Sequence, residues 1–201
     1  MTILKVIKFR EQTPARKTNI ISGKPYHSYR KDLEQDFNHR CGYCNDLDMP
    51  RSSSFEIDHF VPKKLDNTKI NDYSNLVYSC HSCNNAKRAK WPTCLAHIPN
   101  NGKEGWIDPC DVIYGEQFAR DSTDGSIIPL TDLGKWMYDN LKLWKTQHSF
   151  IWRYEQLEKN LNLINNAFHN KPIPSSIRQQ MLELLFEQKK LLNMICNNYE
   201  Q

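Results

Sequence analysis

The sequence has no long apolar run, and this absence removes the membrane-spanning classes first. Its apolar stretches are only a few residues long, whereas a helix that crosses a bilayer needs about 20. Charges at Lys5, Lys8 and Arg10 interrupt the first ten residues, which therefore lack the continuous apolar centre of a signal peptide. We expect a folded, soluble, cytoplasmic protein with no membrane partner.

A strong charge of either sign is also missing. The formal net charge of the 201 residues is +4, which does not by itself indicate a nucleic-acid partner. The positive charge is uneven, since residues 1–40 hold nine Lys or Arg against four Asp or Glu. This excess suits a basic N-terminal arm that faces phosphates. On the charge count alone, a solvated N-terminal segment is a slightly better explanation.

The sequence also lacks the even number of cysteines that a fully paired disulfide framework needs. Seven cysteines in a chain expected to be cytoplasmic argue against a disulfide framework, because thiols stay reduced there and an odd number leaves one unpaired. Four of them form two Cys-x-x-Cys pairs, Cys41/Cys44 and Cys80/Cys83, and two such pairs indicate a tetrahedral structural zinc rather than thiol redox catalysis. The others have no paired spacing and are expected to be small apolar residues: Cys94, Cys110 and Cys196.

Hydrophobic periodicity predicts the elements around these pairs. Apolar residues at every fourth position favour a helix over residues 27–37. Residues 54–61 and 75–78 suit two strands, and residues 84–90 suit a short basic helix that stops before Pro92. We expect residues 1–97 to form one domain.

The second half of the chain has a different pattern. Proline and glycine are frequent in residues 98–130, which are expected to be a loop-rich connection. Residues 131–201 carry apolar stripes of helical period on either side of Pro172 and Pro174. They predict a helical hairpin, which closes the protein's own core or docks a partner through Trp136, Trp144 and Trp152.

The residues between and after the two cysteine pairs carry the chemistry. They read Glu56-Ile-Asp-His-Phe-Val-Pro62, then Asn75-Leu-Val, then Cys80-His-Ser-Cys-Asn-Asn-Ala-Lys87. This order and spacing resemble the HNH endonucleases. The resemblance covers residues 37–90 and implies an α+β fold with a ββα-metal core, to which this chain adds an N-terminal helix and the C-terminal hairpin.

The resemblance also implies the residue roles. His59 would be the general base, Asn75 would orient its imidazole, and Asp58 and Asn84 would bind a catalytic Mg²⁺ or Mn²⁺. Lys87 would hold a phosphate oxygen, and the path of the DNA would be lined by further cations: Lys63, Lys64, Arg88 and Lys90. A neutral histidine and hard oxygen ligands suit metal-dependent phosphodiester hydrolysis. Asn84 could also cap its helix.

Three points stay open. Neighbours on a regular strand point to opposite faces, so a shared site for Asp58 and His59 requires a distorted strand end. Glu56 could reach the cation through water or act as a salt-bridge partner, and His81 is expected to be solvated or to lie behind a ligand. Residues 106–110, Trp-Ile-Asp-Pro-Cys, have no assigned role.

The sequence therefore predicts an HNH DNA endonuclease, and the alternative is a non-catalytic zinc module that binds nucleic acid or protein. A nuclease core followed by helices resembles the HNH subunits that accompany an ATPase in Septu-type and retron-type antiphage systems. That layout implies a role in antiviral defence and an ATPase partner.

Overall fold

The computed structural model describes residues 5–21 and 23–197, so the first four residues of the expected arm and the last four of the expected hairpin lie outside the described residues. The described chain divides into two compact units. One holds residues up to Ser122 together with Ile127–Trp144, and the other holds Thr123–Ser126 and the residues from Lys145 onward. No helix among the described residues is both long enough and apolar enough to cross a membrane.

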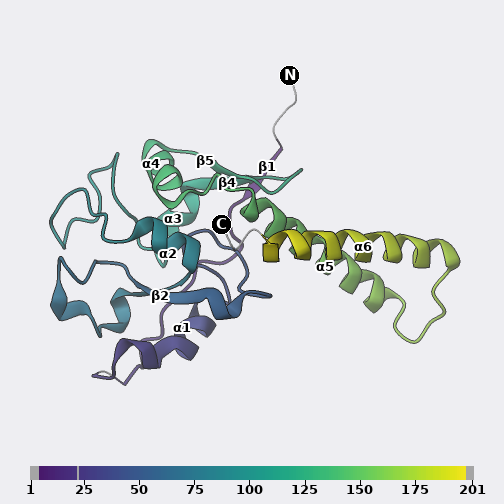
Figure 1. Cartoon of the computed structure of the whole chain (residues 1–201), viewed down its shortest axis with the longest axis horizontal. Coiled ribbons are helices and arrows are strands. Elements are labelled where there is room, and N and C mark those ends of the chain that lie inside the picture. Colours follow the sequence, from purple (N-terminus) through teal and green to yellow (C-terminus); the bar gives the residue numbers. More distant parts are fainter. Residues whose placement is uncertain (1–4, 22, 198–201) are drawn as a thin grey trace. The chain divides into compact units, whose positions relative to one another are not determined.

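The first unit is built on a ββα element. Strand β2 (Phe55–His59) pairs antiparallel with β3 (Leu76–Cys80), with Phe55 opposite Cys80 and His59 opposite Leu76. Helix α2 (His81–Lys87) follows β3 directly. The two short 3₁₀ turns of the connection are Asn67–Lys69 and Tyr73–Asn75. Both expected strands and the helix after them are confirmed (Figure 1).

Helix α2 begins and ends three residues earlier than its expected range of 84–90. Cys80 is its N-cap, and the thiol sulfur accepts a hydrogen bond from the amide of Cys83 at 3.5 Å. The helix ends at Lys87 because Arg88 has a φ of 47°. The second cysteine pair therefore forms the first turn of the helix rather than preceding it.

The expected N-terminal helix is also present. A 3₁₀ turn, Tyr26–Tyr29, continues into α1 (Arg30–Asp36). Its apolar stripe is buried, since Tyr29, Leu33 and Phe37 are each at most 2% exposed. Burying three such side chains contributes several kcal/mol, at about 1.5–3 kcal/mol each. A further 3₁₀ turn, Ser52–Ser54, precedes β2.

Residues 98–130 are not the structureless connection that proline and glycine suggest. They contain α3 (Val112–Glu116), β4 (Phe118–Asp121) and β5 (Ile127–Pro129). These strands form a second sheet in the order β1-β4-β5, in which β1 (Val6–Lys8) lies antiparallel to β4. The aromatic side chains of this segment are in the core: Trp106, Tyr114 and Phe118. Apart from Thr123–Ser126, the segment belongs to the first unit.

The boundary of the helical hairpin also differs from the expected residue 131. Helix α4 (Asp132–Leu141) is capped by Thr131, whose hydroxyl accepts from the amide of Gly134 at 2.9 Å. It buries Met137 and Leu141 in the core of the first unit and ends at Lys142, which has a φ of 57°. Only the helices after it form the hairpin.

The second unit is an antiparallel pair of helices, α5 (Gln147–Ala167) and α6 (Ser175–Asn197) (Figure 1). Pro172 and Pro174 lie between them, as expected from the breaking effect of proline. Leu191 and Ile195 are buried, and Arg153 on α5 pairs with Glu187 on α6.

Two arginines of the basic N-terminal segment, Arg10 and Arg16, pack into the fold, while most other described residues of that segment are exposed. Arg10 donates to the carbonyls of Pro109 and Gly42, at 3.0 and 3.1 Å. Arg16 donates to the carbonyl of Leu76 at 2.7 Å and pairs with Asp108. These guanidinium groups donate hydrogen bonds to backbone carbonyl groups. A count of charges cannot distinguish such arginines from arginines that bind phosphate.

Candidate active site and zinc centre

The four cysteines of the two pairs form one buried cluster. Cys41 and Cys44 follow α1, while Cys80 and Cys83 open α2, and all four are at most 1% exposed. Their sulfur atoms lie within 4.8 Å of one another, and the Sγ atoms of Cys44 and Cys80 are 3.8 Å apart. Zinc–sulfur bonds of about 2.3 Å in a tetrahedron place sulfurs about 3.8 Å apart. The donor set fits a structural Zn²⁺.

Close packing rather than an unusual dihedral explains the glycine of the first pair. A Cβ on Gly42 would lie 2.7 Å from Cε1 of Phe37 and 2.8 Å from Cγ1 of Val77. The amide of Gly42 also donates to the carbonyl of Tyr78 at 2.8 Å. The absence of a side chain thus allows the first cysteine turn to lie directly against α1 and β3.

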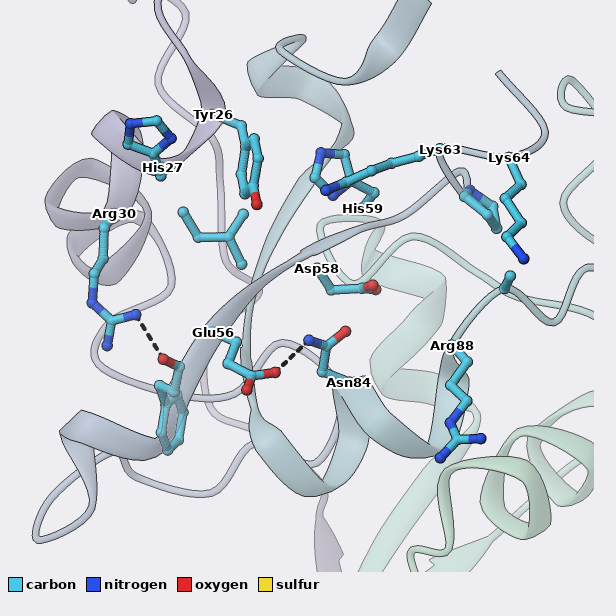
Figure 2. A pocket seen from close by; sticks show the side chains of 14 residues that line it. Tyr26, His27, Arg30, Glu56, Asp58, His59, Lys63, Lys64, Asn84 and Arg88 are labelled. Carbon is cyan, nitrogen blue, oxygen red and sulfur yellow. Dashed lines mark hydrogen bonds between the residues drawn. The ribbon is translucent and has the colours of Figure 1, made fainter. Parts of the chain in front are cut away.

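A pocket of about 580 Å³ opens beside this centre (Figure 2). Its lining comes from β2, from α2 and from the N-terminal helical segment. Of the residues expected to do chemistry, three line it: Asp58, His59 and Asn84. The expected conflict between neighbouring strand residues does not keep Asp58 and His59 apart, since both line the same pocket, although β2 stays in register with β3 as far as His59.

The imidazole of His59 is held by a backbone carbonyl. Its Nε2 atom lies 2.8 Å from the carbonyl oxygen of Ile70. A carbonyl can only accept, so Nε2 carries the hydrogen and Nδ1 is the basic nitrogen of the neutral ring. Burial, with a smaller effect of the nearby Lys63, lowers the pKa of His59 below its ordinary value, even though the hydrogen bond to Ile70 opposes this. The ring is neutral at pH 7 and can accept a proton.

Two donors hold the carboxylate of Asp58. The hydroxyl of Tyr43 donates to Oδ2 at 2.5 Å, and the ammonium of Lys87 lies 2.9 Å from the same oxygen. Because both use Oδ2, the other carboxylate oxygen is the one with which Asp58 can bind a ligand. Tyr43 lies inside the first cysteine pair, so the zinc centre and the pocket are joined through this hydrogen bond.

Asn84 and Glu56 face each other across α2 and β2. The amide nitrogen of Asn84 donates to Oε2 of Glu56 at 2.5 Å, and Nδ1 of His81 lies 2.7 Å from Oε1. Burial raises the pKa of Glu56, but the hydrogen bonds from His81 and Asn84 outweigh it and lower that pKa below its ordinary value. Glu56 is therefore an ionised hydrogen-bond acceptor, and His81 contacts it as a neighbour of the pocket.

Asn75 is buried and acts on the loop after β2. Its Oδ1 accepts from the amide of Val61 at 2.8 Å, and its Nδ2 donates to the carbonyls of Val61 and Lys69 at 3.1 and 3.3 Å. The expected direct contact with the imidazole is replaced by an indirect one. Asn75 holds the residue before Ile70, whose carbonyl holds His59.

Four of the five cations expected to bind DNA divide into two groups, and the fifth, Lys90, does not line the pocket. Lys63, Lys64 and Arg88 line the pocket with exposed side chains, as the path of an anionic substrate requires. Lys87 does not, because its side chain is fully buried and its ammonium also donates to the carbonyl of His59 at 3.0 Å. The expected contact between Lys87 and a phosphate is therefore corrected to a contact with Asp58 and the end of β2.

The N-terminal segment contributes residues to the pocket that sequence reasoning did not single out: Tyr26, His27 and Arg30. The ring of Tyr26 meets that of His59 edge to face, with centroids 4.8 Å apart, and the ammonium of Lys63 lies 4.3 Å from the Tyr26 ring centre. Arg30 donates to the carbonyl of Phe55 at 2.6 Å (Figure 2). Only tertiary packing brings these residues to the site.

Residues 106–110, which had no expected role, support the core. Trp106 is fully buried, and its indole donates to the carbonyl of Lys90 at 2.7 Å. Its ring centre lies 5.9 Å from the ammonium of Lys87. Asp108 and Pro109 are the partners of Arg16 and Arg10. Trp106 thus packs against the buried lysine.

The donors that converge on the pocket fit a hard divalent cation. Asp58 offers a carboxylate oxygen, and the amide oxygen of Asn84 points to the side of Asp58 (Figure 2). Mg²⁺ in proteins is bound by one or two such oxygens together with water and substrate phosphates. These two residues therefore could hold Mg²⁺ or Mn²⁺, with water or a substrate phosphate in the remaining positions.

Comparison with known proteins agrees with this arrangement. Residues 41–90 match the family model of the HNH endonucleases. The chain is also similar to the Septu protein PtuB of Bacillus mycoides (strain KBAB4), with 29% identity over 105 residues that cover 42% of this chain and 35% of that protein. The similarity thus spans about a third of that relative's length. No solved structure matches the chain significantly.

Proposed function

We propose that this chain, whose residues 41–90 form an HNH-type core, is a metal-dependent DNA endonuclease. The observation that carries the proposal is the convergence of His59, Asp58 and Asn84 on one pocket, from the end of β2 and the middle of α2. Two further observations support it: the exposed cations at the rim of the pocket, Lys63, Lys64 and Arg88, and the match to the HNH endonuclease family.

His59 is the general base of the proposed reaction. Nδ1 of the neutral ring accepts a proton from water, the resulting hydroxide attacks phosphorus, and the bond from phosphorus to the 3′ oxygen breaks. The carbonyl of Ile70, held at 2.8 Å, keeps the hydrogen on Nε2 and stabilises the charged ring that forms. The leaving 3′ oxygen takes a proton from water, so the products are a 5′ phosphate and a 3′ hydroxyl, and His59 returns its own proton to solvent.

Asp58 and Asn84 are the proposed ligands of the catalytic Mg²⁺ or Mn²⁺. When bound, such a cation neutralises charge that develops on the phosphate and on the leaving oxygen. Tyr43 and Lys87 fix the carboxylate of Asp58 from behind. A structural Zn²⁺ on the four cysteines would tie the first turn of α2, which carries Asn84, to the turn that holds Cys41 and Cys44.

DNA is the proposed substrate, and its backbone would cross the rim of the pocket. Lys63, Lys64 and Arg88 carry the exposed positive charge there. Phosphate contacts of this kind provide affinity and position without reading sequence.

The test is cleavage of supercoiled plasmid by the purified chain in Mg²⁺ or Mn²⁺. We expect the parent protein to cut and His59→Ala to be inactive, with unchanged zinc content and melting temperature. His97→Ala is the matched control, since His97 is exposed and lies outside the pocket. A His59→Ala variant that cuts at the parent rate would remove His59 from the role of base.

The alternative is a zinc module that binds nucleic acid or protein without cutting. The four-cysteine cluster alone supports both functions. The alternative provides no reason for the convergence of a neutral histidine, a carboxylate and an amide on a basic pocket. DNA binding without cleavage in either metal, by a chain with its zinc in place, would favour it.

Antiphage defence in the bacterial cytoplasm is the proposed setting, on the basis of the similarity to a Septu protein. We further propose that the first unit is the nuclease domain and that the hairpin docks an ATPase partner. On α6 three apolar side chains lie on one face and are 45–71% exposed: Leu182, Leu185 and Phe186. Changing all three to glutamine is expected to abolish co-purification with a neighbouring ATPase gene product and to leave plasmid cleavage intact.

A further inference from the structure

Glu56 connects the two elements that supply the proposed metal ligands. It lies two residues before Asp58 on β2, so the two side chains share a face of the strand. It contacts α2 twice, through Asn84 and through His81, which lie one helical turn apart. A single carboxylate therefore spans from the strand that carries Asp58 to the helix that carries Asn84.

The donor and the acceptor of the hydrogen bond between Asn84 and Glu56 are fixed by their chemistry. A carboxylate without a proton can only accept a hydrogen bond, so Glu56 requires the amide nitrogen of Asn84 at 2.5 Å rather than its oxygen. The amide is planar, and its oxygen must then point away from Glu56. Figure 2 shows that this places the amide oxygen on the side of Asp58.

The opposite orientation of the amide would prevent metal binding. The amide nitrogen carries two hydrogens and offers no lone pair to a cation, whereas the oxygen is a ligand of the kind that Mg²⁺ accepts. Asn84 alone has no preference between the two orientations. The partner of its nitrogen decides which end faces the pocket.

We propose that Glu56 is a positioning residue, which turns the amide oxygen of Asn84 toward the catalytic cation and holds α2 at its distance from β2. This inference rests on the proposed function, since it assumes that Asp58 and Asn84 bind that cation. His81 holds the second oxygen of Glu56 at 2.7 Å, so the carboxylate cannot rotate away from Asn84 without losing this contact as well.

The first test is Mn²⁺ binding by the full chain without DNA, followed as loss of the free-ion EPR signal. Glu56→Gln is expected to weaken binding about tenfold or more, the range typical of residues that orient a metal ligand. The Mg²⁺ concentration that gives half-maximal cleavage should rise in parallel. Zinc content and melting temperature should not change. Glu104→Gln, which alters an exposed carboxylate in another loop, is the control.

A second variant separates orientation from charge. Asn84→Asp replaces the amide by a carboxylate, in which either oxygen can bind the cation, so no orienting partner is needed. In that background Glu56→Gln should no longer weaken Mn²⁺ binding, because either oxygen of the new carboxylate can face the cation whatever group its other oxygen contacts. A purely electrostatic effect of Glu56 would instead weaken binding in both backgrounds, and that result would overturn the proposal.

The remaining outcomes are equally decisive. Unchanged Mn²⁺ binding in Glu56→Gln would overturn the positioning role while leaving a nuclease that still cuts. Absence of Mn²⁺ binding by the parent would overturn the assignment of Asp58 and Asn84 and, with it, this inference. A parent that binds Mn²⁺ and shows the expected dependence on Glu56, but cuts no DNA, would support the inference and contradict the proposed function.

Discussion

The ammonium of Lys87 lies 2.9 Å from Oδ2 of Asp58, and neither side chain has more than 8% of its surface exposed. A buried ion pair of this kind has little effect on stability as a whole, but removal of one partner leaves a charge without compensation. The pair therefore connects the core of the protein to the carboxylate that we assign to the cation. The aromatic rings of Tyr43 and Trp106 flank the ammonium at about 6 Å.

Lys87→Met is expected to destabilise the fold, because it leaves the buried charge of Asp58 without its partner. The substitution keeps the volume of the side chain, so the removal of its charge is the main change. The loss should be about 3–5 kcal/mol, which is typical when one partner of a buried pair is removed. Urea unfolding of the zinc-loaded protein measures it, with the exposed Lys63→Met as the control. If Lys87→Met unfolded like the parent and only bound DNA more weakly, the phosphate-binding role would be restored.

The rim cations should affect DNA affinity and leave stability unchanged. Each of Lys63→Gln, Lys64→Gln and Arg88→Gln should reduce the slope of log affinity against log salt by about 1, the release of one counterion. Fluorescence anisotropy with the inactive His59→Ala background measures binding without cleavage. Lys103→Gln, in an exposed loop outside the pocket, should leave the slope as it is. Equal slopes for all variants would place the DNA elsewhere.

Zinc removal should unfold the first unit. Cys83→Ser breaks a cluster whose four thiols are buried and within 4.8 Å of one another, so we expect loss of bound zinc and of cooperative unfolding. Cys94→Ser changes an exposed thiol and should keep one zinc per chain. Metal analysis and circular dichroism check both variants. A folded, zinc-free Cys83→Ser protein would contradict a structural role for the metal.

Asn75 offers a test of the indirect support of His59. Asn75→Asp keeps the acceptor for Val61 but turns a donor into a carboxylate that faces two carbonyls, of Val61 and Lys69. We expect it to cost more than Asn75→Ala, by leaving buried polar groups unsatisfied at about 1–3 kcal/mol. Hydrogen exchange should rise in residues 61–70, and cleavage should fall in parallel. Normal protection of this loop with lost activity would favour a direct contact to the imidazole.

Local pattern was sufficient for the ββα element. The apolar residues around Asp58 and those from Leu76 onward predict two strands, and the polar run after the second cysteine pair predicts the helix, which in the structure begins earlier, at His81. These features arise from contacts between residues near in sequence or from a recognisable motif. The resemblance to the HNH endonucleases, rather than the strand pattern, predicts that Asp58, His59 and Asn84 come together, and they do line one pocket.

Partners far apart in sequence were not predictable. Arg10 was counted as a free charge, yet its guanidinium binds Pro109, 99 residues away. Trp106 and Tyr114 lie in a segment rich in proline and glycine, but both are fully buried. The ring of Tyr114 packs on that of Phe9, next to β1, and the ring of Trp106 packs on that of Trp136 in α4. A contact between segments so far apart in sequence produces no hydrophobic periodicity within either segment, so neither segment predicts it.

By itself, the sequence determined the donor groups: four thiols at zinc spacing, and a histidine, a carboxylate and an amide in fixed order. Side-chain type and short spacing define those properties. The tertiary structure decided how each group is used. It places the buried Lys87 in an ion pair with Asp58. It also forms the hydrogen bonds between His59 and the carbonyl of Ile70 and between Asn84 and Glu56. Orientation and burial depend on which distant segments pack together, and a linear pattern carries no direct record of that packing.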